Sequence, residues 1–141
     1  MKYINDSISI QGICPGDWHI ATDLEWMVLE GAVDSQYGIG DFVWDSEMER
    51  GYDAGTNLRT SSGWNLDGNG TDLYGFSALP AGIRDFESSF GLVGYSEYLW
   101  TSTTYDADEA YIRRLTFYFP KSERFGNFTK NYGLSVLCLI D

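Results

Sequence analysis

The sequence has little positive charge, a single histidine and no long hydrophobic run. Lysine and arginine together number 9 against 21 aspartate and glutamate residues, which gives a net charge of −12 at pH 7. Nucleic acids and anionic membrane surfaces both require a positive patch on the protein, so the composition argues against either as a partner. No stretch approaches the roughly 18 apolar residues of a membrane-spanning helix, so no such segment is predicted.

The beginning of the sequence lacks the apolar run of a signal peptide. The first ten residues read "MKYINDSISI", in which no more than two apolar residues are adjacent. This pattern predicts either a protein that is not exported or one whose signal peptide has been removed. Residues 1–12 are expected to form a lead-in strand or a tail.

Catalytic signals are scarce as well. His19 is the one histidine, so a Ser-His-Asp or Cys-His site would have to use it. It stands beside Trp18, just before the best-marked helix, and we assign it a structural role. The carboxylates are numerous, but no spacing singles out an acid–base pair. We therefore predict no catalytic residue, no cofactor and no enzymatic activity.

One acidic turn, "DGNGTD" at residues 67–72, resembles the start of a calcium-binding loop. Oxygen-bearing side chains alternate with glycine there, but the later glutamate that completes an EF-hand loop is missing. The alternative is an ordinary turn rich in Asn, Asp and Gly. We assign no metal ligand to this segment or to any other.

Aromatic residues, in contrast, are abundant. The chain has 5 Trp, 10 Tyr and 8 Phe, more rings than a core of this size requires. Exposed Tyr and Trp are typical of binding surfaces, because they offer large, rigid and amphipathic contact areas. The alternative is a tyrosine-rich sheet whose rings are half-buried for structural reasons.

The length of 141 residues suits one domain covering residues 1–141, with helical signals first. Thr22 and Glu25 fit a capping box, which predicts a helix over about 23–33. Trp26, Leu29 and Val33 would form its inward face. Ser46 is expected to cap a second short helix through residues 47–55.

Strand patterns dominate the second half, after an irregular glycine-rich stretch at 63–94. Four strands are predicted, at residues 98–104, 110–119, 123–130 and 132–140. Short connections favour an antiparallel set, with the nearly all-apolar last strand at its centre. Helices followed by strands indicate an α+β fold. Alternation along 110–119 would place Tyr111, Arg113 and Tyr118 in solvent.

Three blocks of the sequence together resemble one family. They are "CPGDWHIATDLEW" at 14–26, "GTDLYGFSALPAGIR" at 70–84, and "WTSTTYDADEAYIRRL" with "KNYGLSVLCLID" at 100–115 and 130–141. In order and spacing they are similar to the Fibrobacter succinogenes major paralogous domain. Ala21 replaces the usual proline, Leu137 replaces the usual arginine, and Gly16 and Asp17 are transposed. The family offers no established catalytic residue to carry over.

The family is itself similar to the C-type lectin-like fold, which includes the formylglycine-generating enzymes. The resemblance implies one or two helices packed on a twisted antiparallel sheet, with long glycine-rich loops and neighbouring N- and C-terminal strands. In that fold a cysteine near the first helix pairs with one in the last strand, so it implies a Cys14–Cys138 disulfide. The alternative is two reduced, buried cysteines.

The resemblance also indicates a ligand face and a function. In lectin-like folds the region corresponding to residues 105–131 is exposed, and aromatic, acidic, amide and guanidinium groups there suit sugar recognition. The candidate ligand-binding residues are Tyr105, Asp106, Asp108, Tyr111, Arg113, Tyr118, Arg124 and Asn127. We expect a monomeric, non-enzymatic recognition module of an exported bacterial surface lipoprotein, with a glycan or a cell-surface protein as partner. The alternatives are an assembly module, an enzyme on the formylglycine-type fold, or an ordinary solvated sheet face.

Overall fold

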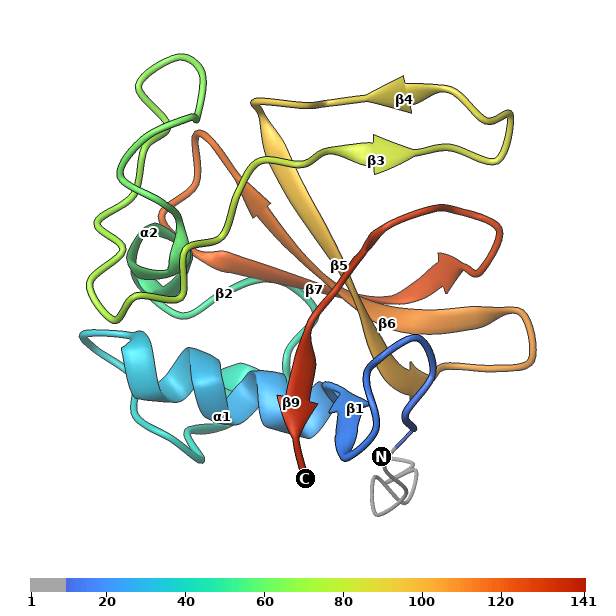
Figure 1. The fold of residues 1–141 in the computed structure, drawn as a ribbon. Coiled ribbons are helices and arrows are strands. Elements are labelled where there is room, and N and C mark those ends of the chain that lie inside the picture. Colours follow the sequence, from blue (N-terminus) through green and yellow to red (C-terminus); the bar gives the residue numbers. More distant parts are fainter. Residues whose placement is uncertain (1–9) are drawn as a thin grey trace.

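The computed structural model describes residues 10–141, and these form a mixed α/β fold (Figure 1). Two α-helices, a short 3₁₀ helix and a mostly antiparallel sheet make up the described part of the chain. The elements in chain order are β1 (Trp18–Ile20), α1 (Asp23–Val33), η1 (Phe42–Asp45), β2 (Met48–Arg50), α2 (Ala54–Leu58), β3 (Ile83–Arg84), β4 (Phe90–Gly91), β5 (Ser96–Thr104), β6 (Glu109–Thr116), β7 (Ser122–Thr129), β8 (Ser135–Val136) and β9 (Cys138–Ile140).

Helix α1 forms as its sequence predicts. Thr22 Oγ1 accepts a hydrogen bond from the Glu25 amide at 3.1 Å, and Glu25 Oε2 accepts one from the Thr22 amide at 2.8 Å. The capping box is therefore confirmed, as are the bounds of the helix. Trp26 and Val33 are buried in the core, and Leu29 packs against it, which confirms the inward face.

The main sheet has the strand order β2-β7-β6-β5-β8 within residues 10–141. Strands β5, β6 and β7 pair antiparallel, as predicted for the first three strands. In Figure 1 helix α1 runs along one face of this sheet, and the ribbon formed by β3 and β4 lies on the opposite side. The core fills the space under α1, with Trp26, Trp44 and Leu58 among its fully buried side chains.

Three predictions about the elements are wrong. Ser46 does not begin a helix: it ends η1, and the chain then enters strand β2. The predicted strand 110–119 stops at Thr116, where the chain turns. The apolar run 132–140 is not one central strand, because β8 joins the sheet edge parallel to β5 and β9 leaves to pair with β1.

The two ends of the described chain are joined near the start of α1. Strands β1 and β9 pair antiparallel, as the family resemblance implies, and Cys14 and Cys138 form a disulfide with their Cα atoms 5.8 Å apart. The predicted lead-in falls mostly on residues 1–9, which lie outside the described residues. Residues 10–12 form no strand, although the Ile10 carbonyl accepts a hydrogen bond from the Ile20 amide at 2.9 Å.

Candidate functional site

A pocket of about 390 Å³ lies where β5 begins and β6 ends. Ser96 and Thr116 face each other across the two strands at this end of the sheet. Half of the lining residues are aromatic, and the others are one leucine and three polar residues: Leu92, Tyr95, Ser96, Tyr98, Arg114, Thr116, Phe117 and Tyr118. A concave, mostly apolar site with a few convergent polar groups is the usual form of a ligand-binding pocket.

The turns before β5 and after β6 bring these rings together. Leu92 and Gly94 adopt positive φ angles of 60° and 86°, so the chain bends sharply into β5. The Tyr95 amide donates to the Leu92 carbonyl at 3.0 Å, and the Phe117 amide donates to the Tyr95 carbonyl at 3.0 Å. Tyr95 and Phe117 therefore meet edge to face, with ring centroids 5.6 Å apart.

The aromatic wall is partly open to solvent. Tyr118 is 57% exposed and Tyr95 is 37% exposed, whereas Tyr98 is buried. The ring of Tyr118 packs against Phe117 with centroids 4.8 Å apart, which holds it beside the pocket. An exposed ring fixed in this way offers a flat apolar surface at little entropic cost on binding.

Arg114 supplies the one charge among the residues that line the pocket. Its Nε donates to Glu123 Oε2 at 2.7 Å, its Nη2 donates to Glu123 Oε1, and it also hydrogen-bonds to Tyr98. The hydrogen bonds that Arg114 donates to Glu123, opposed by burial, raise the pKa of Arg114. Thr116 adds a buried hydroxyl that has no hydrogen-bond partner among the described residues.

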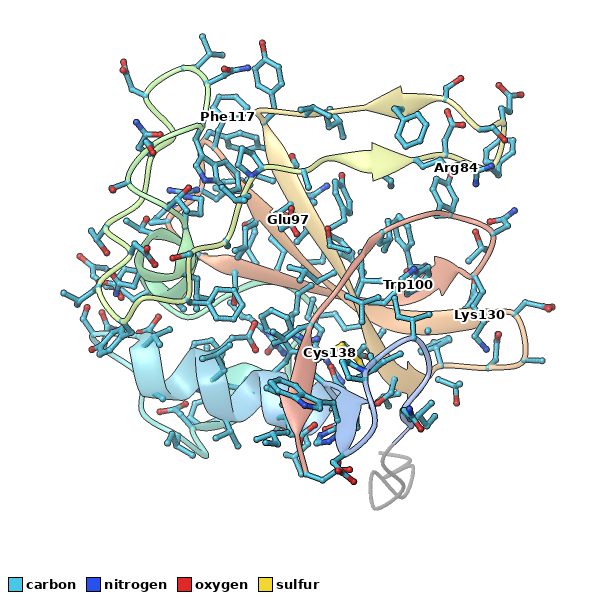
Figure 2. All side chains as sticks on the ribbon, viewed as in Figure 1. Arg84, Glu97, Trp100, Phe117, Lys130 and Cys138 are labelled. Carbon is cyan, nitrogen blue, oxygen red and sulfur yellow. A yellow bond between two sulfur atoms is a disulfide. The ribbon has the colours of Figure 1, made fainter. Side chains whose placement is uncertain are left out.

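The structure divides the predicted ligand residues among three places. Tyr105, Asp106, Asp108 and Asn127 are exposed near the opposite end of β6 from the pocket. Asp106 Oδ1 accepts the amides of residues 108 and 109, and Lys130 Nζ donates to the carbonyls of residues 106 and 107. Figure 2 shows Lys130 and Phe117 at opposite ends of the sheet, so these residues and the pocket form no common site.

Arg113 and Arg124 are buried rather than exposed. Arg113 has no exposed surface, so the prediction that it faces solvent is wrong. Both guanidinium groups donate to the Asp23 carboxylate on α1, Arg113 at 2.7 Å and Arg124 at 2.6 Å. Burial alone would raise the pKa of Asp23, but the two positive charges outweigh it and lower that pKa. Arg124 also lies over the half-buried ring of Tyr111, 4.3 Å from its centroid.

Of the predicted residues, Tyr118 alone lines the pocket. The sequence prediction missed Tyr95, Tyr98, Arg114 and Phe117. For Phe117 a signal exists in the run "TFYF" at 116–119, because three consecutive aromatic residues at a strand end cannot all point into a core. Tyr95 had no such signal, since its place depends on the turn before β5.

His19 lies between two carboxylates at the junction of β1, β9 and α1. Its Nδ1 is 2.6 Å from Asp141 Oδ1, and its Nε2 is 2.8 Å from Glu25 Oε1. The hydrogen bonds to Glu25 and Asp141 raise the pKa of His19, since both carboxylates favour the doubly protonated ring. Both ring nitrogens are engaged in holding structure together, which supports the structural role predicted for this residue.

This arrangement predicts a loss of stability at alkaline pH. Because the folded pKa of His19 lies above its unfolded value of about 6.5, its stabilising effect is complete below that pH and disappears as the pH rises through the folded pKa. Both carboxylates are partly exposed, so we expect less than about 1 kcal/mol. Urea unfolding at pH 5.5 and 8.5 should show a lower midpoint at pH 8.5. In the variant His19→Gln most of this difference should vanish, and an unchanged difference would contradict the assignment.

Residues 10–141 contain no group of three or more His, Cys, Asp or Glu side chains placed to hold a metal ion. The side chains of the "DGNGTD" turn instead serve the local backbone. Asn69 Oδ1 accepts the Trp64 amide at 3.0 Å, and Asp72 accepts both the amide and the hydroxyl of Ser77 at 2.7 Å. No helix within the described residues is long and apolar enough to cross a membrane.

Comparison with known proteins identifies the family. No curated protein and no solved structure is similar enough to count as a match. The model of the Fibrobacter succinogenes major domain matches residues 3–139, nearly the full length of the sequence. The chain therefore belongs to the Fibrobacter succinogenes major domain family.

Proposed function

We propose that this domain is a non-enzymatic recognition module that binds a glycan through the aromatic pocket between β5 and β6. The proposal rests on the aromatic wall formed by Tyr95, Phe117 and Tyr118, in which the exposed ring of Tyr118 is held beside the pocket. A sugar ring presents a C–H face that packs on such a surface, while its hydroxyls form directional hydrogen bonds with neighbouring polar side chains.

An exported location at a bacterial cell surface fits the covalent structure. Cys14 and Cys138 are joined in a disulfide, and such bonds persist in oxidising compartments outside the cytoplasm. The acidic composition suits a protein that stays soluble and monomeric in an extracellular setting.

A C-type lectin-like fold is part of the proposal. It is supported by three features that such a fold combines: paired terminal strands β1 and β9, a helix that starts beside them, and a disulfide between Cys14 ahead of that helix and Cys138 in the last strand. Fold likeness alone carries no activity, so the function rests on the pocket.

An assembly module is the second candidate, because apolar side chains are exposed on the β3–β4 ribbon and in the segment after it. Phe86, Phe90 and Val93 are 60%, 79% and 63% exposed. Large exposed apolar patches mark protein contacts as well as ligand sites. A concentration-dependent dimer or higher oligomer in analytical ultracentrifugation would favour this function over glycan recognition.

A pair of tyrosine variants tests the proposed site. We expect Tyr118→Ala to weaken binding to any glycan identified on an array by at least about tenfold, or 1.4 kcal/mol, because it removes the most exposed ring of the pocket. Tyr105→Ala is the matched control: it removes another exposed tyrosine, at the opposite end of the sheet. Titration calorimetry measures both affinities, with circular dichroism to verify folding.

The two variants also separate the two possible ligand surfaces. If Tyr105→Ala abolishes binding and Tyr118→Ala does not, the ligand face is the 105–108 turn and the pocket proposal is wrong. An array without any hit, in the presence or absence of calcium, would contradict glycan recognition itself.

A further inference from the structure

We infer that the aromatic pocket accepts an uncharged sugar ring and rejects acidic sugars such as uronic acids. This inference rests on the proposed glycan recognition and names the class of sugar. It follows from the charges that surround Arg114, the cation in the pocket lining.

Arg114 stands in a row of side chains that crosses the sheet on one face. Its direct neighbours across the strands are Tyr98 on β5 and Glu123 on β7, and the neighbour of Glu123 on β2 is Glu49. Residues directly opposite one another in paired strands share a face, so the four side chains lie side by side. The row contains two carboxylates and one guanidinium group, and its net charge is negative.

The charge of Arg114 is already balanced within the protein, by Glu123. Its Nε and Nη2 both donate to Glu123, a buried carboxylate, and its guanidinium carbon lies 5.9 Å from the Tyr98 ring centroid and 5.0 Å from that of Phe125. A carboxylate on a sugar would therefore meet an arginine whose positive charge Glu123 already balances. It would also stand close to the charge of Glu123, which disfavours binding.

The other arginines add to this effect because most are turned inward. Arg50, Arg59, Arg113 and Arg124 are all buried. Their charges face α1, backbone carbonyls and other side chains, whereas most of the 21 acidic residues remain at the surface. The field around the protein is thus negative and repels anionic glycans on approach.

An uncharged ring fits the remaining groups of the pocket. Tyr95, Phe117 and Tyr118 give an apolar surface for the C–H face of a pyranose. Ser96 and Thr116 are the uncharged small polar residues of the lining, and both are buried.

The test compares neutral and acidic oligosaccharides of the same length. The probes are hexamers of glucose, mannose and galactose and hexamers of the matching uronic acids, titrated into the folded, disulfide-bonded protein at low salt. We expect at least one neutral hexamer to bind and its uronic acid counterpart to bind at least about tenfold more weakly. Equal or tighter binding of the acidic hexamer would overturn the inference while leaving glycan recognition intact, whereas no binding of either kind would contradict the proposed function.

The variant Glu123→Gln gives an independent test of this discrimination between neutral and acidic sugars. It removes the neutralising charge while keeping the size of the side chain, so Arg114 becomes a free cation in the pocket. We expect the affinity for the neutral hexamer to stay within about threefold and the discrimination against the acidic one to shrink by about tenfold, with a salt-sensitive affinity. Unchanged discrimination in a folded variant would overturn the role assigned to Glu123.

Discussion

Changing Glu30 to glutamine should lower the free energy of unfolding by about 3–5 kcal/mol, the cost of leaving buried charges uncompensated. Glu30 lies on helix α1 and contacts the sheet, and it has no exposed surface. Its carboxylate accepts from Arg50 Nη2, from Arg113 Nε at 3.1 Å and from Ser122 Oγ at 2.7 Å. A glutamine would remove the negative charge and place an N–H₂ group against an N–H donor.

The effect is large because the whole cluster is buried under α1. Arg50, Arg113 and Arg124 carry three positive charges there, balanced by Asp23 and Glu30 alone among the groups that they contact. Burial, together with the nearby charge of Arg113, lowers the pKa of Arg50. With Glu30 neutral, Asp23 is the one carboxylate that still forms ion pairs with these guanidinium groups within residues 10–141.

Urea unfolding followed by tryptophan fluorescence measures the loss. Glu49→Gln is the matched control, because Glu49 directly precedes Arg50 on strand β2 but is exposed. Removing its charge should change the free energy of unfolding by less than about 0.5 kcal/mol. A loss below about 1 kcal/mol for Glu30→Gln would mean that the cluster contributes little to the fold.

The burial of this charged cluster could not be predicted from the sequence. Helix α1 was predictable in full, because its capping box and apolar spacing are local signals. Arg113 was placed in solvent because alternation assigns charged side chains to the outside of a sheet. Whether an arginine is buried depends on a carboxylate at the opposing position, and Asp23 and Glu30 lie far from it in the sequence.

Local sequence patterns also could not predict which strands pair with each other. The run 132–140 reads as one buried strand because it is apolar, but Leu137 separates β8 from β9 and the two halves join different sheets. The pocket escaped prediction for the same reason. Its walls come from the start of β5 and the end of β6, and they meet only when Tyr95, before β5, is hydrogen-bonded to Phe117, after β6.

Replacing both Cys14 and Cys138 by alanine should destabilise the protein by about 4 kcal/mol. The disulfide joins residues 124 apart in sequence, and closing a loop of about 100 residues in the unfolded chain is worth about 4.7 kcal/mol in the entropic model. The bond was implied by family resemblance, because spacing alone left a reduced pair open.

The measurement is urea unfolding of wild type and double variant, each with and without reductant. Reduced wild type should unfold at nearly the same midpoint as the double variant, and reductant should leave the variant unchanged. Other links between the two ends of the described chain, such as the β1–β9 pairing and the His19 contacts, are short or partly exposed and cannot replace a covalent bond. Equal midpoints for oxidised and reduced wild type would therefore mean that the unfolded chain already holds its ends together, so that closing this loop has little entropy left to remove.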